Sequence, residues 1–354
     1  MDDYKNIVVI QTAFLGDVIL TLPLVQELKK ALPASMIDLV VVPRAAELLA
    51  THPDIHRTII YDKRKTDAGI HGFFRKRGEL RLRHYDVALV PHRSLRSAAL
   101  AAMASIPRRI GFDKSVGRFL FTDTVCYEQS LHEIMRNVQL LKPLGIVPHE
   151  GILPRLYPSR EDSVAVDNLL SASNIDTTKL IGIAPGSVWN TKRWLKENYS
   201  TLAQRLYADG FHIILIGGVE DVDLCGEISS MSQSRYVTSS AGKLSLLQSA
   251  ELIGRCRLLV SNDSAPMHLA VAMQTPVVAI FGATIPEFGF APQGDHDIVV
   301  EVKGLSCRPC SSHGGHTCPI STFDCMKRIL PDDVYDRLHS VLNSIPTKGL
   351  LSYK

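Results

Sequence analysis

Short apolar runs alternate with longer stretches of helical character along most of the chain. Eight of these runs have the length and β-branched content of strands; they are Ile7–Ile10, Ile37–Val42, Thr58–Tyr61, Asp86–Val90, Leu180–Ala184, His212–Gly217, Arg257–Ser261 and Pro276–Phe281. Near-continuous apolar strands separated by helices are typical of parallel sheets that are covered on both faces. The pattern therefore predicts an α/β protein.

The strand pattern restarts once along the chain. A polar helical stretch at 159–172 and a turn-rich segment at 174–179 precede the fifth run. The length of 354 residues also indicates two domains, at about 150 residues per domain. We predict two Rossmann-like doubly wound domains, 1–155 and 156–354, facing a central crevice, and a last helix at 331–342 that packs on either of them.

The net charge of +3 conceals a local excess of cations. Residues 63–83 hold eight Lys or Arg against Asp67 and Glu79, a net +6, so the remainder of the chain sums to −3. A generally basic nucleic-acid-binding protein is therefore excluded, and one anion-attracting segment is predicted. No apolar run approaches the about 18–20 residues that cross a bilayer, and the acidic start does not resemble a signal peptide. We expect a cytoplasmic protein.

Ligands of doubly wound domains bind beyond the carboxyl ends of the strands, so the residues that follow each strand are candidates for chemistry. After the first strand come Gly16, which permits a tight turn or a close approach of the backbone, and Asp17, which falls at the start of a helix. Asp17 is interpreted either as a helix cap alone or as a general base that accepts a proton from an acceptor hydroxyl.

Two loops of the second half have the composition of phosphate sites. The first combines a glycine, hydroxyls and cations with both tryptophans of the chain, Trp189 and Trp194; its candidates are Gly186, Ser187, Thr191 and Lys192. The tryptophans are also explained as anchors of the loop. The second loop opens a helix before a proline, where free amides suit a pyrophosphate; its candidates are Asp263, Ser264, Ala265 and His268. The alternative for this loop is a capped helix with His268 in the core. Asp221, between them, is a candidate for ribose hydroxyls.

Several signatures are missing, and one cluster is left over. The sequence has no G-x-G-x-x-G, no Walker motif and no G-x-S-x-G, so dehydrogenases, P-loop kinases and esterases lose their main support. Four of the seven cysteines gather outside the candidate loops, at Cys307, Cys310, Cys318 and Cys325. They are interpreted either as a structural zinc site or redox pair, or as reduced cysteines.

The candidate loops together resemble glycosyltransferase family 9, the ADP-heptose:lipopolysaccharide heptosyltransferases, and within it the heptosyltransferase II type. The resemblance covers residues 7 to about 330 and rests on five motifs in order; they are Gly16-Asp17-Val18 with Thr21-Leu22-Pro23, Arg109-Ile-Gly-Phe112 with His132-Glu133 and Arg136-Asn137, Pro185-Gly186-Ser187 with Lys192-Arg193-Trp194, Asn262-Asp263-Ser264 with Met267-His268-Leu269-Ala270, and Phe281-Gly282-Ala283-Thr284 with the late cysteines. The chain departs from the family at Ala265, where Gly is usual, and at Leu195, where Pro is common.

The resemblance implies a GT-B fold and inverting transfer of heptose from ADP-heptose to an inner-core sugar, with no metal or other cofactor required. Carried over by position, Asp17 becomes the catalytic base. Lys192, with Ser187 and the amides near Ser264 and Ala265, would stabilise the departing diphosphate; Asp263 would position the loop or its cation, and His268 would lie near the phosphates.

The same resemblance gives the basic segment a partner, the phosphates and acid sugars of a lipid-linked acceptor at the inner face of the inner membrane. The expected acceptor-binding residues are Gly16, Arg75, Lys76, Arg77, His92, Arg93 and Arg96. Phe73 and Phe74 are expected to touch lipid, and the protein is expected to act as a monomer. The alternatives are a family member that uses another nucleotide sugar or acceptor, and a non-catalytic, zinc-stabilised anion-binding protein.

Overall fold

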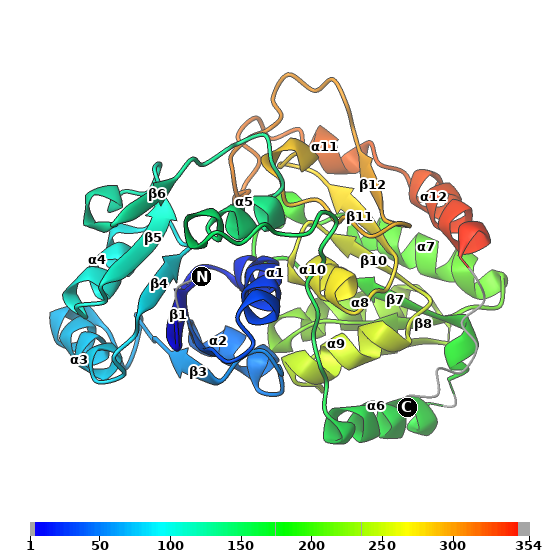
Figure 1. The fold of residues 1–354 in the computed structure, drawn as a ribbon. Helices are drawn as coiled ribbons and strands as arrows, with labels where there is room; N and C mark the ends of the chain where they lie inside the picture. The colour runs from blue at the N-terminus through cyan, green and yellow to red at the C-terminus, as the bar shows by residue number, and fades with distance from the viewer. Residues whose placement is uncertain (1–3, 174, 235, 346–354) are drawn as a thin grey trace. The chain divides into compact units, whose positions relative to one another are not determined.

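The computed structural model describes residues 4–173, 175–234 and 236–345. The chain divides into two compact units, Met1–Tyr157 (unit 1) and Pro158–Lys354 (unit 2), a division two residues beyond the predicted boundary. Each unit contains one six-stranded sheet, and the strands pair in parallel throughout the described residues. The predicted α/β class with two Rossmann-like domains is confirmed (Figure 1).

Unit 1 arranges its strands in the order β3-β2-β1-β4-β5-β6. Helix α1 packs against α5 and α2, whereas α3 packs against α4 on the other face of the sheet. Its elements are β1 (Asn6–Ile10), α1 (Leu15–Ala31), β2 (Met36–Val41), α2 (Pro43–Ala46), η1 (Glu47–Leu49), β3 (Arg57–Ile60), α3 (Gly69–Arg81), β4 (Val87–Val90), α4 (Leu95–Met103), β5 (Arg108–Phe112), η2 (Arg118–Leu120), β6 (Asp123–Val125), α5 (Glu133–Gln139) and η3 (Lys142–Leu144).

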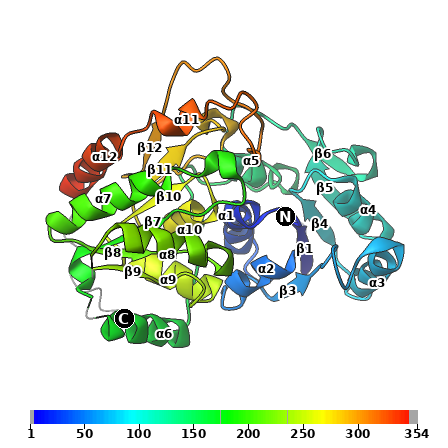
Figure 2. The ribbon, with the colours of Figure 1, turned by 180° about the vertical axis from the view of Figure 1, so that it is seen from behind.

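Unit 2 repeats this topology, with the order β12-β11-β10-β7-β8-β9. Helices α7, α8 and α12 cover one face, while α9, α10 and α6 pack together on the other (Figure 2). Its elements are α6 (Arg160–Ala172), η4 (Thr177–Lys179), β7 (Leu180–Ala184), η5 (Asn190–Lys192), α7 (Lys196–Ala208), β8 (His212–Leu215), η6 (Val219–Asp221), α8 (Val222–Met231), β9 (Val237–Ser239), α9 (Leu246–Arg255), β10 (Leu258–Asn262), α10 (Ala265–Ala272), β11 (Val277–Phe281), η7 (Pro286–Phe288), β12 (Ile298–Glu301), α11 (Asp324–Lys327) and α12 (Pro331–Ser344).

The central strands form because they are apolar on both faces. Every residue of β4, β7, β10 and β11 is buried, and so is all of β1 beyond its first residue. The last helix, α12, packs against α7 and β12 and so belongs to unit 2. The polar stretch that opens unit 2 is helix α6; Ser159 caps it, since its hydroxyl accepts a hydrogen bond from the Asp162 amide at 3.2 Å.

The strand order places one topological switch point in each unit. In unit 1 the order reverses between β1 and β4, and in unit 2 between β7 and β10. Loops beyond the carboxyl ends of such strand pairs diverge and leave room for a ligand. The loops that follow β1, β4, β7 and β10 contain most of the predicted site residues, so each unit holds a candidate site of its own.

Candidate active site

Asp17 lies in the first turn of α1, directly beyond β1. Its Oδ2 atom accepts a hydrogen bond from the Phe14 amide at 3.1 Å, and the Thr21 hydroxyl donates to its carbonyl oxygen at 2.8 Å. The carboxylate is partly exposed and sits at the positive end of the helix. Gly16 is the second residue of the same helix and so does not form a tight turn; a close backbone approach at this glycine stays a prediction. Asp17 caps its helix and remains accessible to a ligand.

A buried ion pair on α5 stands next to Asp17. Asn137 donates from Nδ2 to the carbonyl oxygen of Leu20 at 3.1 Å and so fixes α5 on α1. One turn earlier in α5, Glu133 pairs with Arg136 at 2.9 Å. Burial raises the pKa of Glu133, Arg136 opposes the shift, and the nearby charge of Asp17 raises this pKa further. In the sequence, Glu133, Arg136 and Asn137 stood out only as part of the resemblance to the family. No local pattern predicted that they would lie beside Asp17.

His92, beyond β4, belongs to a buried polar cluster at the same switch point. Its Nδ1 atom lies 3.0 Å from the Thr12 hydroxyl and 3.1 Å from the Ser97 hydroxyl. The Lys63 ammonium donates to the Thr12 carbonyl oxygen at 2.8 Å. Burial lowers the pKa of His92 to about 4, and the charges of Lys63 and Arg93 add to this shift. At neutral pH His92 is therefore an uncharged hydrogen-bonding group.

The depressed pKa of His92 makes unit 1 sensitive to acid. Between the ordinary value of 6.5 and the folded value of about 4, the unfolded chain binds a proton that the folded chain excludes, so stability falls as the pH falls through this window. We expect His92 to account for about 2 kcal/mol of the loss between about pH 7.5 and pH 5. Both tryptophans lie in unit 2, so amide hydrogen exchange of β1 and β4 is the appropriate measurement.

The His92→Gln variant should lose much of that pH dependence, because glutamine keeps hydrogen-bonding atoms but does not titrate. His71→Gln, at an exposed position of α3, serves as the control. A His92→Gln protein whose β1 and β4 protection falls as steeply with acid as that of the wild type would contradict this assignment.

The two predicted arginines of α4 and its approach contact unit 1 itself. The Arg93 guanidinium lies 4.1 Å from the centre of the Tyr127 ring. Arg96 donates to the hydroxyl of Tyr61 and, at 3.1 Å, to the carbonyl oxygen of Gly69. Arg93 remains exposed, whereas Arg96 ties α4 to the start of α3. Both stay predictions as acceptor contacts, and Arg93 has the more open position.

The basic segment 63–83 is largely paired within unit 1. Arg75 forms an ion pair with Asp67 at 2.7 Å, although its side chain is 61% exposed. Lys76 is buried and pairs with Glu79 at 2.6 Å. Arg77 donates to the Met103 carbonyl oxygen at 2.7 Å. The predicted acceptor contact of Lys76 does not fit this burial, because its ammonium would have to leave Glu79 and the protein interior.

In unit 2 the buried Asn262 joins the loops beyond β7 and β10. Its Oδ1 atom accepts hydrogen bonds from the Trp194 amide at 3.0 Å and the Tyr199 hydroxyl at 2.9 Å, and its Nδ2 atom donates to the Pro185 carbonyl oxygen at 2.8 Å. Trp194 is buried and donates from Nε1 to the Ile329 carbonyl oxygen at 2.9 Å. This tryptophan therefore anchors the loop, as one of the two sequence interpretations held.

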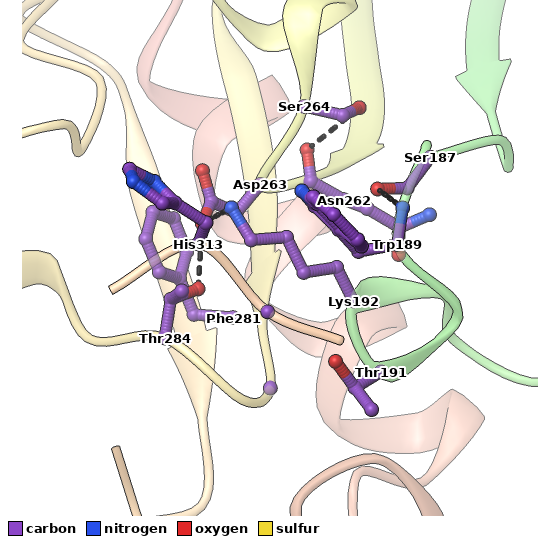
Figure 3. A network of polar contacts seen from close by, with 12 residues as sticks. Ser187, Trp189, Thr191, Lys192, Asn262, Asp263, Ser264, Phe281, Thr284 and His313 are labelled. Atoms are coloured by element: carbon purple, nitrogen blue, oxygen red, sulfur yellow. Dashed lines mark hydrogen bonds and ion pairs between the residues drawn. The ribbon is translucent and has the colours of Figure 1, made fainter. Parts of the chain in front are cut away.

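Lys192 and Asp263 form an ion pair at the same switch point (Figure 3). The Lys192 ammonium lies 2.6 Å from Oδ2 of Asp263, and the Thr284 hydroxyl donates to the same oxygen at 2.6 Å. Asp263 is 7% exposed. A buried carboxylate held from two sides fixes the ammonium in place, and an ammonium held in this way is suited to a phosphoryl oxygen.

Further predicted residues surround this pair, with different environments. The Ser264 hydroxyl donates to the Gly186 carbonyl oxygen at 3.3 Å. A Cβ atom on Gly186 would stand 2.2 Å from a carboxylate oxygen of Asp221, so a larger residue here would require the Asp221 side chain to shift. Ser187 accepts a hydrogen bond from the Trp189 amide at 3.3 Å. These contacts bring together Gly186, Asp221 and Ser264, from three loops.

The helix that follows β10 positions the last two candidates. Ser264 is the residue before α10, which begins at Ala265, so the amide of Ala265 lies in the first turn. This end of the helix suits an anion. His268 is buried within the helix. A direct phosphate contact of His268 stays a prediction.

Thr191 and the cysteine-rich segment are in contact, which the sequence did not predict. The Thr191 hydroxyl is buried and accepts a hydrogen bond from the Gly315 amide at 2.7 Å, while the Thr191 amide donates to the Gly315 carbonyl oxygen at 3.1 Å. The segment that joins the cysteines therefore contacts a candidate loop, although the cysteines themselves lie outside the loops in the sequence.

The four late cysteines are near one another as free thiols. Burial raises the pKa of Cys310, with contributions from Cys307 and Cys318, and burial raises the pKa of Cys325 to about 11. Within the described ranges, no three or more His, Cys, Asp or Glu side chains form a group that could hold a metal ion. A structural zinc site at these cysteines stays a prediction. Across all the residues that the structure describes, no helix is long and apolar enough to span a membrane.

Known proteins resemble this chain in both sequence and fold. Residues 73–319 match the model of glycosyltransferase family 9 (heptosyltransferase). Lipooligosaccharide heptosyltransferase 2 of Haemophilus ducreyi is 31% identical over 80% of this chain and 85% of its own length. Lipopolysaccharide heptosyltransferase 2 of Salmonella typhimurium is 29% identical over 96% and 99% of the two chains.

Two solved structures extend the similarity over nearly the whole fold. A glycosyl transferase family 9 protein from Veillonella parvula superposes with a TM-score of 0.86 at 25% identity, covering 98% of this chain and 99% of that one. The ADP-heptose LPS heptosyltransferase II of Escherichia coli gives a TM-score of 0.77 at 24% identity, with 96% and 99% covered. With the doubly wound units and their switch-point residues, these similarities mean that the chain belongs to glycosyltransferase family 9.

Proposed function

We propose that this protein is an inverting glycosyltransferase that moves a heptose from ADP-heptose to an inner-core sugar of lipopolysaccharide. The observation that carries the proposal is the Lys192–Asp263 ion pair beside the first turn of α10, in a chain of this family. The donor follows from the ADP-heptose LPS heptosyltransferase II of Escherichia coli, and the class of acceptor from relatives named lipooligosaccharide or lipopolysaccharide heptosyltransferase 2. The inner-core sugar follows from the family resemblance. Unit 1 would bind the acceptor and unit 2 the nucleotide sugar.

In the proposed reaction, the Asp17 carboxylate accepts the proton of the acceptor hydroxyl as its oxygen attacks the anomeric carbon. The new glycosidic bond forms on the face opposite the bond to the diphosphate, which breaks, and the configuration inverts. The leaving diphosphate gains negative charge. The Lys192 ammonium and the first amides of α10 would stabilise that charge, so the proposal requires no metal ion or other cofactor.

Binding measurements with nucleotides test the donor assignment. A ligand that binds only the folded protein raises its melting temperature. We expect ADP and ADP-heptose to stabilise unit 2, which the fluorescence of Trp189 and Trp194 reports, and UDP, GDP and CMP to have little effect. If another nucleoside diphosphate stabilises the protein instead, the donor is a sugar carried by that nucleotide and not ADP-heptose. If no nucleotide raises the melting temperature, the proposed function is contradicted.

We further propose that unit 1 binds the inner face of the inner membrane, where a lipid-linked acceptor is presented. Exposed apolar residues lie on α3 and η2, which both pack against α4, with Ile70 65%, Phe74 46% and Phe119 75% exposed. Arg75, on α3, and Arg118, on η2, are exposed as well. Apolar side chains mixed with cations suit an anionic bilayer surface. Phe73 is partly buried against the core of unit 1, so Phe74 is the better candidate for lipid contact.

Vesicle sedimentation tests the membrane proposal. The wild type should bind vesicles with about 30 mol% phosphatidylglycerol and bind neutral phosphatidylcholine vesicles weakly. The double variant Phe74→Ser/Phe119→Ser should bind the anionic vesicles about tenfold less, since two aromatic side chains no longer enter the interface. Val147→Ser, which changes an exposed position after η3, is the matched control. Equal binding of the double variant and the control would contradict the proposal that this surface binds the membrane.

We also propose that the enzyme acts as a monomer. Light scattering of the protein in detergent should give the mass of one chain.

A further inference from the structure

The cysteine-rich segment is hydrogen-bonded to the loop after β11, in which the Thr284 hydroxyl donates to Asp263. The Arg308 guanidinium is buried, donates to the Thr284 carbonyl oxygen at 2.7 Å and pairs with Glu301 at 2.7 Å. The Cys310 amide donates to the Ala283 carbonyl oxygen at 3.0 Å. Thr284 is the residue whose hydroxyl holds Asp263. The start of the segment is therefore fixed to the loop of Thr284, which directly contacts Asp263, the ion-pair partner of Lys192.

The middle of the segment lies directly against Lys192. A Cβ atom on Gly314 would stand 3.2 Å from Cγ of Lys192 and 3.2 Å from the Thr191 hydroxyl, and the backbone there has a φ of +90°. The two hydrogen bonds between Thr191 and Gly315 hold the chain at this distance. Residues 313–316 thus follow the Lys192 side chain closely at a position that requires glycine.

Two histidines flank these glycines. His313 is drawn with Lys192, Asp263 and Thr284 in the polar network of Figure 3. The His316 ring lies 5.0 Å from the ring of Trp189 in an edge-to-face arrangement. Both imidazoles are exposed. An imidazole can donate a hydrogen bond to a phosphoryl oxygen whether or not it carries a charge.

We propose that residues 313–316 form one wall of the diphosphate site in unit 2, and that His313 is a further residue that binds the β-phosphate of the donor. This inference rests on the proposed function of the same site. The cysteine-rich segment then has a role in donor binding, because it carries His313 to the position beside Lys192.

Titration calorimetry with matched nucleotides tests this inference. AMP and ADP differ by the β-phosphate alone, so their affinity ratio isolates contacts to that group. For His313→Ala we expect the affinity for ADP to fall about tenfold, as for loss of a hydrogen bond to a charged group, with the affinity for AMP unchanged. His313→Gln, which keeps a donor, should retain most of the ADP affinity. Ser312→Ala, at an exposed position of the same segment, is the control.

An ADP to AMP affinity ratio that is the same in His313→Ala as in the wild type would overturn the inference. The same titrations with UMP and UDP separate it from the donor assignment. If the uridine pair binds instead and its ratio depends on His313, the His313 contact stands and ADP-heptose is the wrong donor. If Lys192→Ala weakens ADP and His313→Ala does not, the donor assignment stands and the His313 contact is wrong.

Discussion

The Asp17→Asn variant should lose about 10³-fold in kcat, because a positioned general base contributes about 10²–10⁴-fold to such a reaction. Asparagine keeps a side-chain oxygen that can accept the Phe14 amide hydrogen bond now made at 3.1 Å, so the start of α1 is preserved. The Kd for ADP should remain unchanged, since Asp17 lies in unit 1 and the proposed nucleotide residues lie in unit 2. Steady-state kinetics with saturating donor, together with calorimetry, measure both quantities.

A comparison of Asp17→Asn with Asp17→Ala separates a loss of catalysis from a loss of folding stability. Asp17→Ala removes the cap as well as the carboxylate and should melt below Asp17→Asn, by an amount expected for an N-terminal cap of about 1 kcal/mol. If kcat of Asp17→Asn stays within about threefold of the wild type, Asp17 is not the base. If Asp17→Ala alone loses activity, the helix cap is what the reaction needs.

The Lys192→Ala variant should lose about 10²–10³-fold in kcat/KM for the donor, a loss typical of a single group that stabilises a developing anion. Two effects add in this variant. The diphosphate loses its cation, and the carboxylate of Asp263, which is 7% exposed and accepts a hydrogen bond from the Thr284 hydroxyl, loses its ion-pair partner. Donor kinetics at fixed acceptor measure the loss.

A double-mutant cycle separates these two effects. In Lys192→Ala/Asp263→Asn the buried charge is gone, so the double variant should be less impaired than the product of the two single losses. Losses that multiply would show that Asp263 does not act through Lys192. Unchanged donor kinetics in Lys192→Ala would contradict the placement of the diphosphate at the first turn of α10.

Much of the fold was predictable because the central strands are apolar on both faces. All eight predicted runs correspond to strands, whereas β5, β6, β9 and β12 were missed. Two arginines begin β5, β6 and β9 have three residues each, and β12 is an edge strand that is mostly half-buried. Short and half-exposed strands lack the continuous hydrophobic signal on which the prediction depended.

The candidate site was predictable where it lies at strand ends. Gly186, Lys192 and Asp263 follow the strands on either side of a switch point, so the topology brings them together. Glu133 could not be found in this way, because its proximity to Asp17 depends on how α5 packs on α1. Lys76 was misjudged for a related reason: the charge count of a segment does not reveal that Glu79 and burial neutralise one of its cations.

The segment around the cysteines shows the same limit. Its composition drew attention to the thiols, whereas its contacts with the site come from Arg308, Gly314 and Gly315, residues with no special spacing. Long-range hydrogen bonds of a loop cannot be deduced from periodicity. A glycine that must approach another chain segment closely is recognised only when that segment is known.

The most direct test of the central claim is a transfer reaction with ADP-heptose and a purified lipid-linked inner-core acceptor. We predict an acceptor product heavier by one heptose, formed without added metal, with an anomeric configuration opposite to that of the donor by nuclear magnetic resonance. A product that retains the donor configuration, or no heptose transfer by protein that binds ADP-heptose, would contradict the claim.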